Sequence, residues 1–76
     1  MIEKLNEALH EELHDVEKYM LMSAQADDKI APILRLIAHE EMRHARHLID
    51  MIHELGGEVT DETNAEVHKA EKAVTK

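Results

Sequence analysis

The feature that most constrains this chain is an apolar seam near its middle that two polar residues interrupt. On an α-helix the seam residues share one face, because they recur at alternating spacings of three and four; they are Leu34, Ile37, Glu41, His44, Leu48, Met51 and Leu55. A carboxylate and an imidazole on the buried stripe of a helix cost free energy unless another group pairs with them. The fold must therefore bring a partner to Glu41 and His44.

An earlier segment, residues 2–26, carries a seam of the same kind. Its members recur at spacings of four and three and are Leu5, Leu9, Glu12, Val16, Tyr19, Ser23 and Ala26. Glu12 is the carboxylate among them. A second apolar row widens the face and consists of Ile2, Leu13, Met20 and Ala24. A helix with so broad an apolar face packs against more than one neighbour.

A short connection between the two segments predicts an antiparallel helical hairpin. Residues 26–29 contain Asp27 and Asp28, either of which can cap the next helix. Gly56 and Gly57 end that helix by supplying a left-handed C-cap conformation. Because the loop is short, we expect two antiparallel neighbouring helices in an all-α fold, with residues 1–57 as the hairpin.

The polar interruptions of the two seams are expected to lie at one level of this hairpin. With the turn centred at Asp28, Glu12 lies 16 residues before it, His44 lies 16 residues after it and Glu41 lies 13 residues after it. A rise of about 1.5 Å per residue then places Glu41 within one helical turn of the other two. No basic residue lies on either seam. The sequence therefore favours a metal ion over a Lys or Arg ion pair as the partner.

The composition limits how else so short a chain can be stabilised. It has 76 residues, no cysteine and a net charge of -8, and the lack of cysteine excludes disulfides, iron–sulfur clusters and thiolate zinc sites. A core of this size rarely supplies more than about 3–5 kcal/mol, so we expect a metal, a second subunit or both. The acidic balance argues against nucleic acid or an anionic membrane as a partner. Without a signal-peptide pattern or a run of ~20 apolar residues, a cytoplasmic location is expected.

One hairpin supplies only half of the ligands that a di-metal site needs. A two-fold related hairpin would complete a four-helix bundle, and Glu12, Glu41 and His44 of both copies would then supply four carboxylates and two imidazoles. Hard oxygen ligands with one imidazole per metal favour iron or manganese, and zinc is also compatible with this ligand set. The expected partner is therefore a second copy, in a homodimer or a larger homo-oligomer.

These residues resemble a known family. The run Glu-Lys-Leu-Asn-Glu-Ala-Leu before Glu12, the run Glu-Glu-Met-Arg-His-Ala that contains Glu41, and the later Leu-Gly-Gly are similar to the first helix pair of bacterioferritins and rubrerythrins. The match covers residues 2–57. The resemblance implies that Glu12, Glu41 and His44 are iron ligands, that Tyr19 is a further catalytic residue beside them, and that the reaction is the oxidation of ferrous iron with dioxygen or peroxide.

These residues depart from that family because they contain no second helix pair with a second Glu and a second Glu-x-x-His. The half-length format resembles the encapsulated ferritin-like proteins, which build a di-iron ferroxidase site across a subunit interface. That resemblance implies iron storage, an encapsulin shell as a partner and a location inside a protein nanocompartment. No recognisable encapsulin-targeting peptide follows Val74.

Several alternatives remain open. A metal-stapled helical assembly module with structural zinc, manganese or iron, and a helical interaction protein without metal, are the alternatives to a ferroxidase. His10 and His14 lie four residues apart beside Glu11 and Asp15 and are candidates for an entry or secondary metal site. Met42 matches the haem-ligating methionine of bacterioferritins, but packing on the flank of the helix is the simpler interpretation.

Residues 58–76 read as a polar tail or as a short third helix. Thr60 or Asp61 could cap such a helix, and its acidic residues come early and its lysines late, as suits a helix dipole. Its apolar row is short and consists of Val67, Ala70 and Val74.

Overall fold

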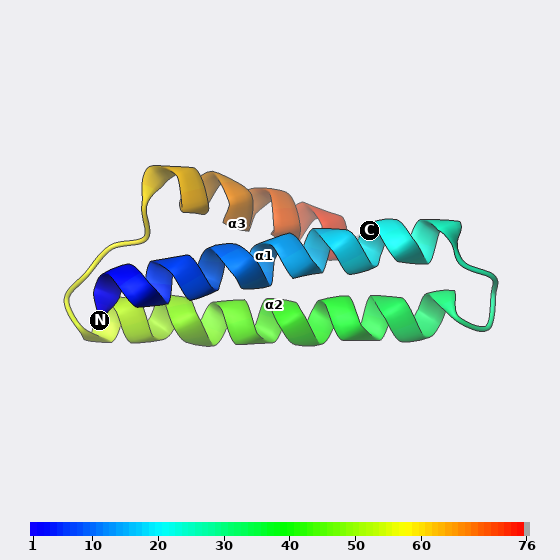
Figure 1. The fold of residues 1–76 in the computed structure, drawn as a ribbon, viewed down its shortest axis with the longest axis horizontal. Helices are drawn as coiled ribbons and strands as arrows, with labels where there is room; N and C mark the ends of the chain where they lie inside the picture. Colours follow the sequence, from blue (N-terminus) through cyan, green and yellow to red (C-terminus); the bar gives the residue numbers. More distant parts are fainter. Residues whose placement is uncertain (76) are drawn as a thin grey trace.

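A computed structural model describes residues 1–75 and contains three α-helices. They are α1 (Ile2–Gln25), α2 (Ala31–Glu54) and α3 (Asp61–Val74). The two long helices form an antiparallel hairpin, and α3 runs beside it and packs mainly on α1 (Figure 1). The described part of the chain is elongated, with extents of 43 × 17 × 17 Å. The all-α prediction is confirmed. Of the two predictions for residues 58–76, a polar tail or a short third helix, the helix is confirmed over residues 61–74.

The turn between α1 and α2 is organised by Asp27. Its Oδ1 accepts hydrogen bonds from the backbone N–H groups of Lys29 and Ile30, each at 3.0 Å. The N-cap of α2 is Ile30, which provides no side-chain cap. Asp27 therefore closes the turn ahead of the helix rather than capping the helix itself, because its side chain satisfies donors that precede the first helical turn.

The end of α2 follows the expected glycine signal. Gly56 adopts a φ of 77°, a left-handed conformation that side chains other than glycine rarely tolerate. Gly57 has a different role, because a Cβ there would lie 2.7 Å from Cδ1 of Ile2. Its missing side chain lets the chain pass close to the start of α1.

The short link to α3 is tied to α1 by a single amide side chain. The Asn6 Nδ2 donates to the backbone carbonyls of Ile2 and Glu58, and its Oδ1 accepts from the backbone N–H of Thr60, each at 3.2 Å. Thr60 in turn caps α3, since its Oγ1 accepts a hydrogen bond from the N–H of Thr63 at 3.3 Å. Asn6 is only 9% exposed, so these bonds satisfy the polar atoms of a side chain that is largely removed from water.

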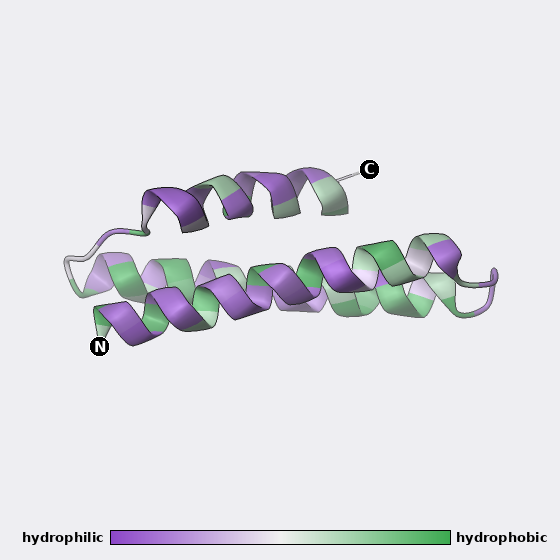
Figure 2. Cartoon of the chain, turned by 45° about the horizontal axis from the view of Figure 1, so that its top comes forward, coloured by the Kyte–Doolittle hydropathy of each residue, from purple (hydrophilic) through white to green (hydrophobic). Residues whose placement is uncertain are grey.

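The core of the molecule lies where all three helices meet. Its buried members are Leu9, Leu13 and Val16 from α1, Ala38, Met42, Ala45 and Ile52 from α2, and Ala70 and Val74 from α3. α3 is mainly hydrophilic and presents only a short apolar row to the hairpin, as Figure 2 shows. The α2 row that contains Ala38, Met42 and Ala45 is buried in this core, which α1 and α3 share with it.

The seam predicted for α2 is therefore not its most buried row. Leu34, Ile37 and Leu48 are only half-buried, while Met51 is 45% exposed and Leu55 is 53% exposed. The physical reason is that the neighbouring row, with Ala38, Met42 and Ala45, faces the core shared with α1 and α3, whereas residues 1–75 cover the predicted seam only in part.

We call this half-covered side of the hairpin the open face. All its members are half-buried or exposed; they are Leu5, Ala8, Glu12, Asp15, Tyr19 and Met22 from α1, and Leu34, Ile37, Glu41, His44, Leu48 and Met51 from α2.

Candidate metal site

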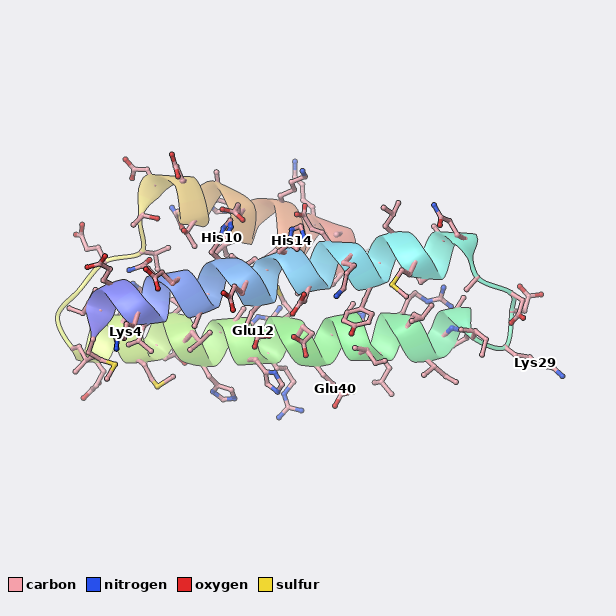
Figure 3. All side chains as sticks on the ribbon, viewed as in Figure 1. Lys4, His10, Glu12, His14, Lys29 and Glu40 are labelled. Carbon is pink, nitrogen blue, oxygen red and sulfur yellow. The ribbon has the colours of Figure 1, made fainter. Side chains whose placement is uncertain are left out.

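Three ligand-type side chains meet at the middle of the open face. Glu12 comes from α1, and Glu41 and His44 come from α2. One ligand atom from each lies within 4.8 Å of the others. Figure 3 shows Glu12 between the two long helices. The predicted level placement is confirmed, because a constant helical rise fixes it once the turn is known.

The distances from the His44 imidazole to the two carboxylates are too long for hydrogen bonds. The Nδ1 of His44 lies 3.8 Å from Oε2 of Glu12 and 3.7 Å from Oε1 of Glu41. The Glu12 and Glu41 side chains are 28% and 21% exposed, while that of His44 is 59% exposed. The carboxylates are thus partly removed from water without gaining a cationic partner at contact distance.

One oxygen of the group has no partner within the described residues. Oε2 of Glu12 is buried and makes no hydrogen bond. Most buried polar atoms in proteins are satisfied, so an exception calls for an explanation such as an ion. The two carboxylates and the imidazole of this group fit a hard or borderline divalent cation.

The electrostatics of the group also fit a cation. The pKa of Glu12 is raised from 4.5 to about 7, chiefly because a hydrogen bond with the Glu41 carboxyl requires a proton on one of the two. Burial and the negative charges of Glu41, Asp15 and Glu11 add to this rise in pKa. A divalent cation would replace that proton and relieve the same repulsion.

Tyr19 lies on the open face one heptad after Glu12. It is half-buried, and the Nζ of Lys18 lies 4.9 Å from the centre of its ring. This is a cation–π distance. Its catalytic role stays a prediction.

His10 takes part in a contact that the sequence did not reveal. Its Nδ1 lies 2.8 Å from Oε1 of Glu66, so it joins α1 to α3. His14 is exposed beside it (Figure 3). Within residues 1–75, these two histidines do not form a three-ligand group of metal-binding geometry. The acidic partner was missed because α3 had no assigned position in the sequence-based hairpin.

Met42 belongs to the core rather than to a ligand site. It is fully buried and packs among the residues that α1, α2 and α3 share. The packing interpretation is the one that this position supports, although the methionine lies deeper than the flank predicted for it.

The sequence of residues 3–76 matches the rubrerythrin family. The chain belongs to this family. It is also 41% identical over 71 residues to a bacterioferritin of Desulfovibrio desulfuricans, a match that covers 88% of this chain and 40% of that relative. The chain thus spans about two fifths of the length of the curated relative that it matches.

No solved structure matches the chain. The resemblance to rubrerythrins and bacterioferritins is confirmed, while that to the encapsulated ferritin-like proteins stays a prediction. Across the described residues, none of the helices of this rubrerythrin-family chain has the length and apolar character to cross a membrane.

Proposed function

We propose that this chain is a ferroxidase that binds ferrous iron as substrate at a di-iron centre formed across a subunit interface. The observation that carries this proposal is the unpartnered, buried Glu12 oxygen inside a group of three ligand-type side chains. Membership of the rubrerythrin family and similarity to a bacterioferritin support iron over other metals.

The number of ligands supports a second copy of the chain. Glu12, Glu41 and His44 give one hairpin two carboxylates and one imidazole. Carboxylate-bridged di-metal sites in helical bundles use about twice that set, drawn from four helices. Two copies would supply four negative charges, which two divalent cations balance.

The residues of the chain would prepare the site in three ways. Glu12 and Glu41 supply negative charge in a half-buried position, where it acts more strongly on a cation than it would in water. Glu12 would release its shared proton when a cation binds. His44 would bind as a neutral imidazole, three residues from Glu41 and therefore on the same side of α2.

The bound iron supplies the electrons: two ferrous ions become ferric while dioxygen takes up two electrons and two protons to give hydrogen peroxide. With peroxide as the oxidant, the same two electrons and two protons give water. Charge is balanced in both cases, because the two protons that are taken up match the two electrons that leave the iron, and the product formed from peroxide is two molecules of water.

A metal-stapled assembly module remains the second candidate. The same oxygen-rich ligand set is compatible with structural zinc or manganese. Such a protein would gain stability from the metal but would consume no dioxygen. Storage of the oxidised iron, and association with an encapsulin shell in a nanocompartment, would be later steps that depend on the ferroxidase proposal.

Oxygen uptake after anaerobic loading with ferrous iron tests the proposal. We expect uptake that saturates at two iron ions per pair of chains, and its loss in Glu41→Ala and His44→Ala. Each substitution removes two ligands from a symmetric site. The matched controls are Glu40→Ala and His47→Ala, which change exposed residues of the same helix outside the group.

In these variants helicity without metal should be nearly unchanged, because neither Glu41 nor His44 belongs to the shared core. Metal binding without oxygen uptake in the parent chain would favour the structural module. Uptake at the parent rate in His44→Ala would place the chemistry elsewhere.

A further inference from the structure

The helix α1 carries a second pattern of metal-binding type that the open face does not use. Residues 10–14 read His10-Glu11-Glu12-Leu13-His14 and match the pattern His-Glu-x-x-His. On a helix this spacing of four places two imidazoles side by side, close enough to bind one zinc ion together. Two surface histidines alone do not make a site, so their surroundings must decide.

His10 and His14 lie on the side of α1 that borders α3, away from the open face. Successive residues of a helix are turned by about 100°, so these two are about 40° apart, and Glu12 is turned by about 200° from either of them. Figure 3 shows both histidines at the edge of α1 next to α3. An ion held by this pair is therefore separate from the group of Glu12, Glu41 and His44.

One of the two imidazoles already has a fixed orientation. The Nδ1 of His10 lies 2.8 Å from Oε1 of Glu66 on α3, a hydrogen-bond distance. An ionised carboxylate only accepts hydrogen bonds, so Nδ1 of His10 carries the proton, and in the neutral ring Nε2 keeps its lone pair for a metal. Histidines that bind metals commonly donate their other ring N–H to a carboxylate in this way.

We propose that His10 and His14 bind one zinc-type divalent ion through their imidazoles, with Glu66 as the positioning residue that fixes the tautomer of His10. This inference does not depend on the ferroxidase proposal. Glu66 is not a ligand here, which agrees with the absence, within residues 1–75, of three ligand atoms from these side chains within 4.8 Å of one another. Water fills the positions that the protein leaves open, as zinc allows.

The surroundings of the pair favour a small cation. An open hollow of about 360 Å³ lies against it and is lined by His10, Glu11, His14 and Asp15. Glu11 and Asp15 place negative charge beside the imidazoles, which attracts cations. His14 is exposed, so its ring can turn toward His10 without displacing packed side chains. Because imidazole ligands favour zinc, nickel and copper(II), this pair is expected to select a different metal from the oxygen-rich group on the open face.

A metal at this pair would also tie α3 to the hairpin. A cation bound at Nε2 draws electron density from the ring, so the Nδ1–H of His10 becomes a stronger donor to Glu66. The coupling is reciprocal, because whatever zinc adds to the docking of α3, the docked α3 adds to the affinity for zinc. Zinc should therefore slow hydrogen exchange over residues 61–74.

Zinc titration of the Glu41→Ala/His44→Ala chain tests the site, because that variant lacks the ligand group of the open face. We expect one zinc ion per chain by calorimetry, and binding roughly tenfold or more weaker when His14→Ala is added. The matched control is His68→Ala, which removes an exposed histidine of α3. Calcium in excess should leave zinc bound, because calcium prefers oxygen ligands.

Substitutions of Glu66 test its positioning role separately from folding. Glu66→Ala should weaken zinc binding by about tenfold, and Glu66→Gln should restore much of this loss, because its side-chain carbonyl still accepts from Nδ1. Glu62→Ala changes an exposed glutamate one turn earlier on α3 and should have little effect. Long-range proton–nitrogen NMR should show the proton of His10 on Nδ1 in the metal-free chain and a loss of this preference in Glu66→Ala.

The results either support the inference or overturn it. Tenfold losses of zinc affinity in His14→Ala and Glu66→Ala, with zinc-dependent protection of residues 61–74, support it. Unchanged zinc affinity in His14→Ala, displacement of zinc by calcium, or a His10 proton on Nε2 in the metal-free chain would overturn it. None of these results bears on oxygen uptake at the open face, so the ferroxidase proposal is tested independently.

Discussion

Glu12 is partly buried, is repelled by neighbouring carboxylates and has one side-chain oxygen without a hydrogen-bond partner within the described residues. Its carboxylate lies beside Glu41 on a half-buried face, and one of its oxygens has no partner within residues 1–75. A protein selected only for stability would replace such a group with an apolar side chain. Its retention is understandable if a cation occupies the group, since the cation satisfies the oxygen and removes the repulsion.

The raised pKa of Glu12 predicts how the metal-free protein responds to pH. Its pKa is about 7 in the folded chain against 4.5 ordinarily, so the folded state holds a proton that the unfolded state has already released. Stability should therefore fall as pH rises from about 4.5 to about 7 and then level off. The full difference in pKa corresponds to about 3 kcal/mol, and solvent screening of the partly exposed carboxylate reduces the expected loss to about 1–2 kcal/mol, to be measured by urea unfolding with a chelator present.

Glu12→Gln is the informative variant for this measurement. It keeps the shape of the side chain and removes the titration, so its stability should show less of the fall than the parent. Glu40→Gln changes an exposed glutamate one residue from Glu41 and serves as the control. A parent and a Glu12→Gln curve that run parallel between pH 4.5 and pH 7 would contradict the shared proton.

At the scale of the helices, α3 packs on one side of the hairpin and adds its apolar residues to the core there. It is held by the Asn6 amide at its start, by a bidentate contact of Arg46 with Glu71 at 3.0 and 3.2 Å, and by Lys69 at 3.4 Å from Glu17. The ion pairs are exposed and contribute little to stability. The buried amide contacts and the apolar row around Ala70 are the stronger part.

Asn6→Ala should loosen α3 more than the rest of the chain. The change leaves the Glu58 carbonyl and the Thr60 N–H without their partner, at a cost of about 1–3 kcal/mol. Hydrogen exchange should show reduced protection over residues 61–74 before it does so in α1 or α2. Asn64→Ala, at an exposed position on α3, should have little effect. Equal loss of protection in all three helices would mean that α3 does not unfold separately.

The sequence predicts the hairpin and the meeting of Glu12, Glu41 and His44 well, because both depend on local rules. Helical rise and a short turn are enough to set the register. The buried row of α2 was not predicted, because Ala38 and Ala45 are small and Arg46 lies beside them. That row becomes part of the core through tertiary contacts with α1 and α3, which the spacing of the apolar residues in α2 does not predict.

At the scale of the whole molecule, one side of the hairpin is closed by α3 and the other is open. The open face carries both the ligand group and large apolar side chains such as Met51. Exposed apolar surface of this kind, rimmed by polar residues, is typical of an interaction site. The proposed second copy would cover this surface and complete the metal centre in one step.

Association predicts that thermal stability depends on protein concentration. If a second copy covers the open face, mass action raises the melting temperature as the concentration of the chain increases. Ultracentrifugation should show a dimer or larger species at low micromolar concentration, with more of it when a divalent metal is present. The isolated hairpin with α3 should be only marginally stable, because a folded unit of this size buries a smaller fraction of its surface than a larger domain does.

Substitutions at two exposed apolar residues can distinguish specific docking on the open face from non-specific hydrophobic association. Met51 lies on the open face and is 45% exposed, whereas Leu21 is 64% exposed but borders a groove beside α3 with Lys69 and Ala73. Met51→Ala should weaken dimerisation by about tenfold, as expected if two methionines per dimer lose part of their burial. Leu21→Ala should leave dimerisation unchanged, and both constants follow from sedimentation equilibrium. If Leu21→Ala weakens the dimer as much as Met51→Ala does, the contact between copies lies on the α3 side, and the open face is not the interface.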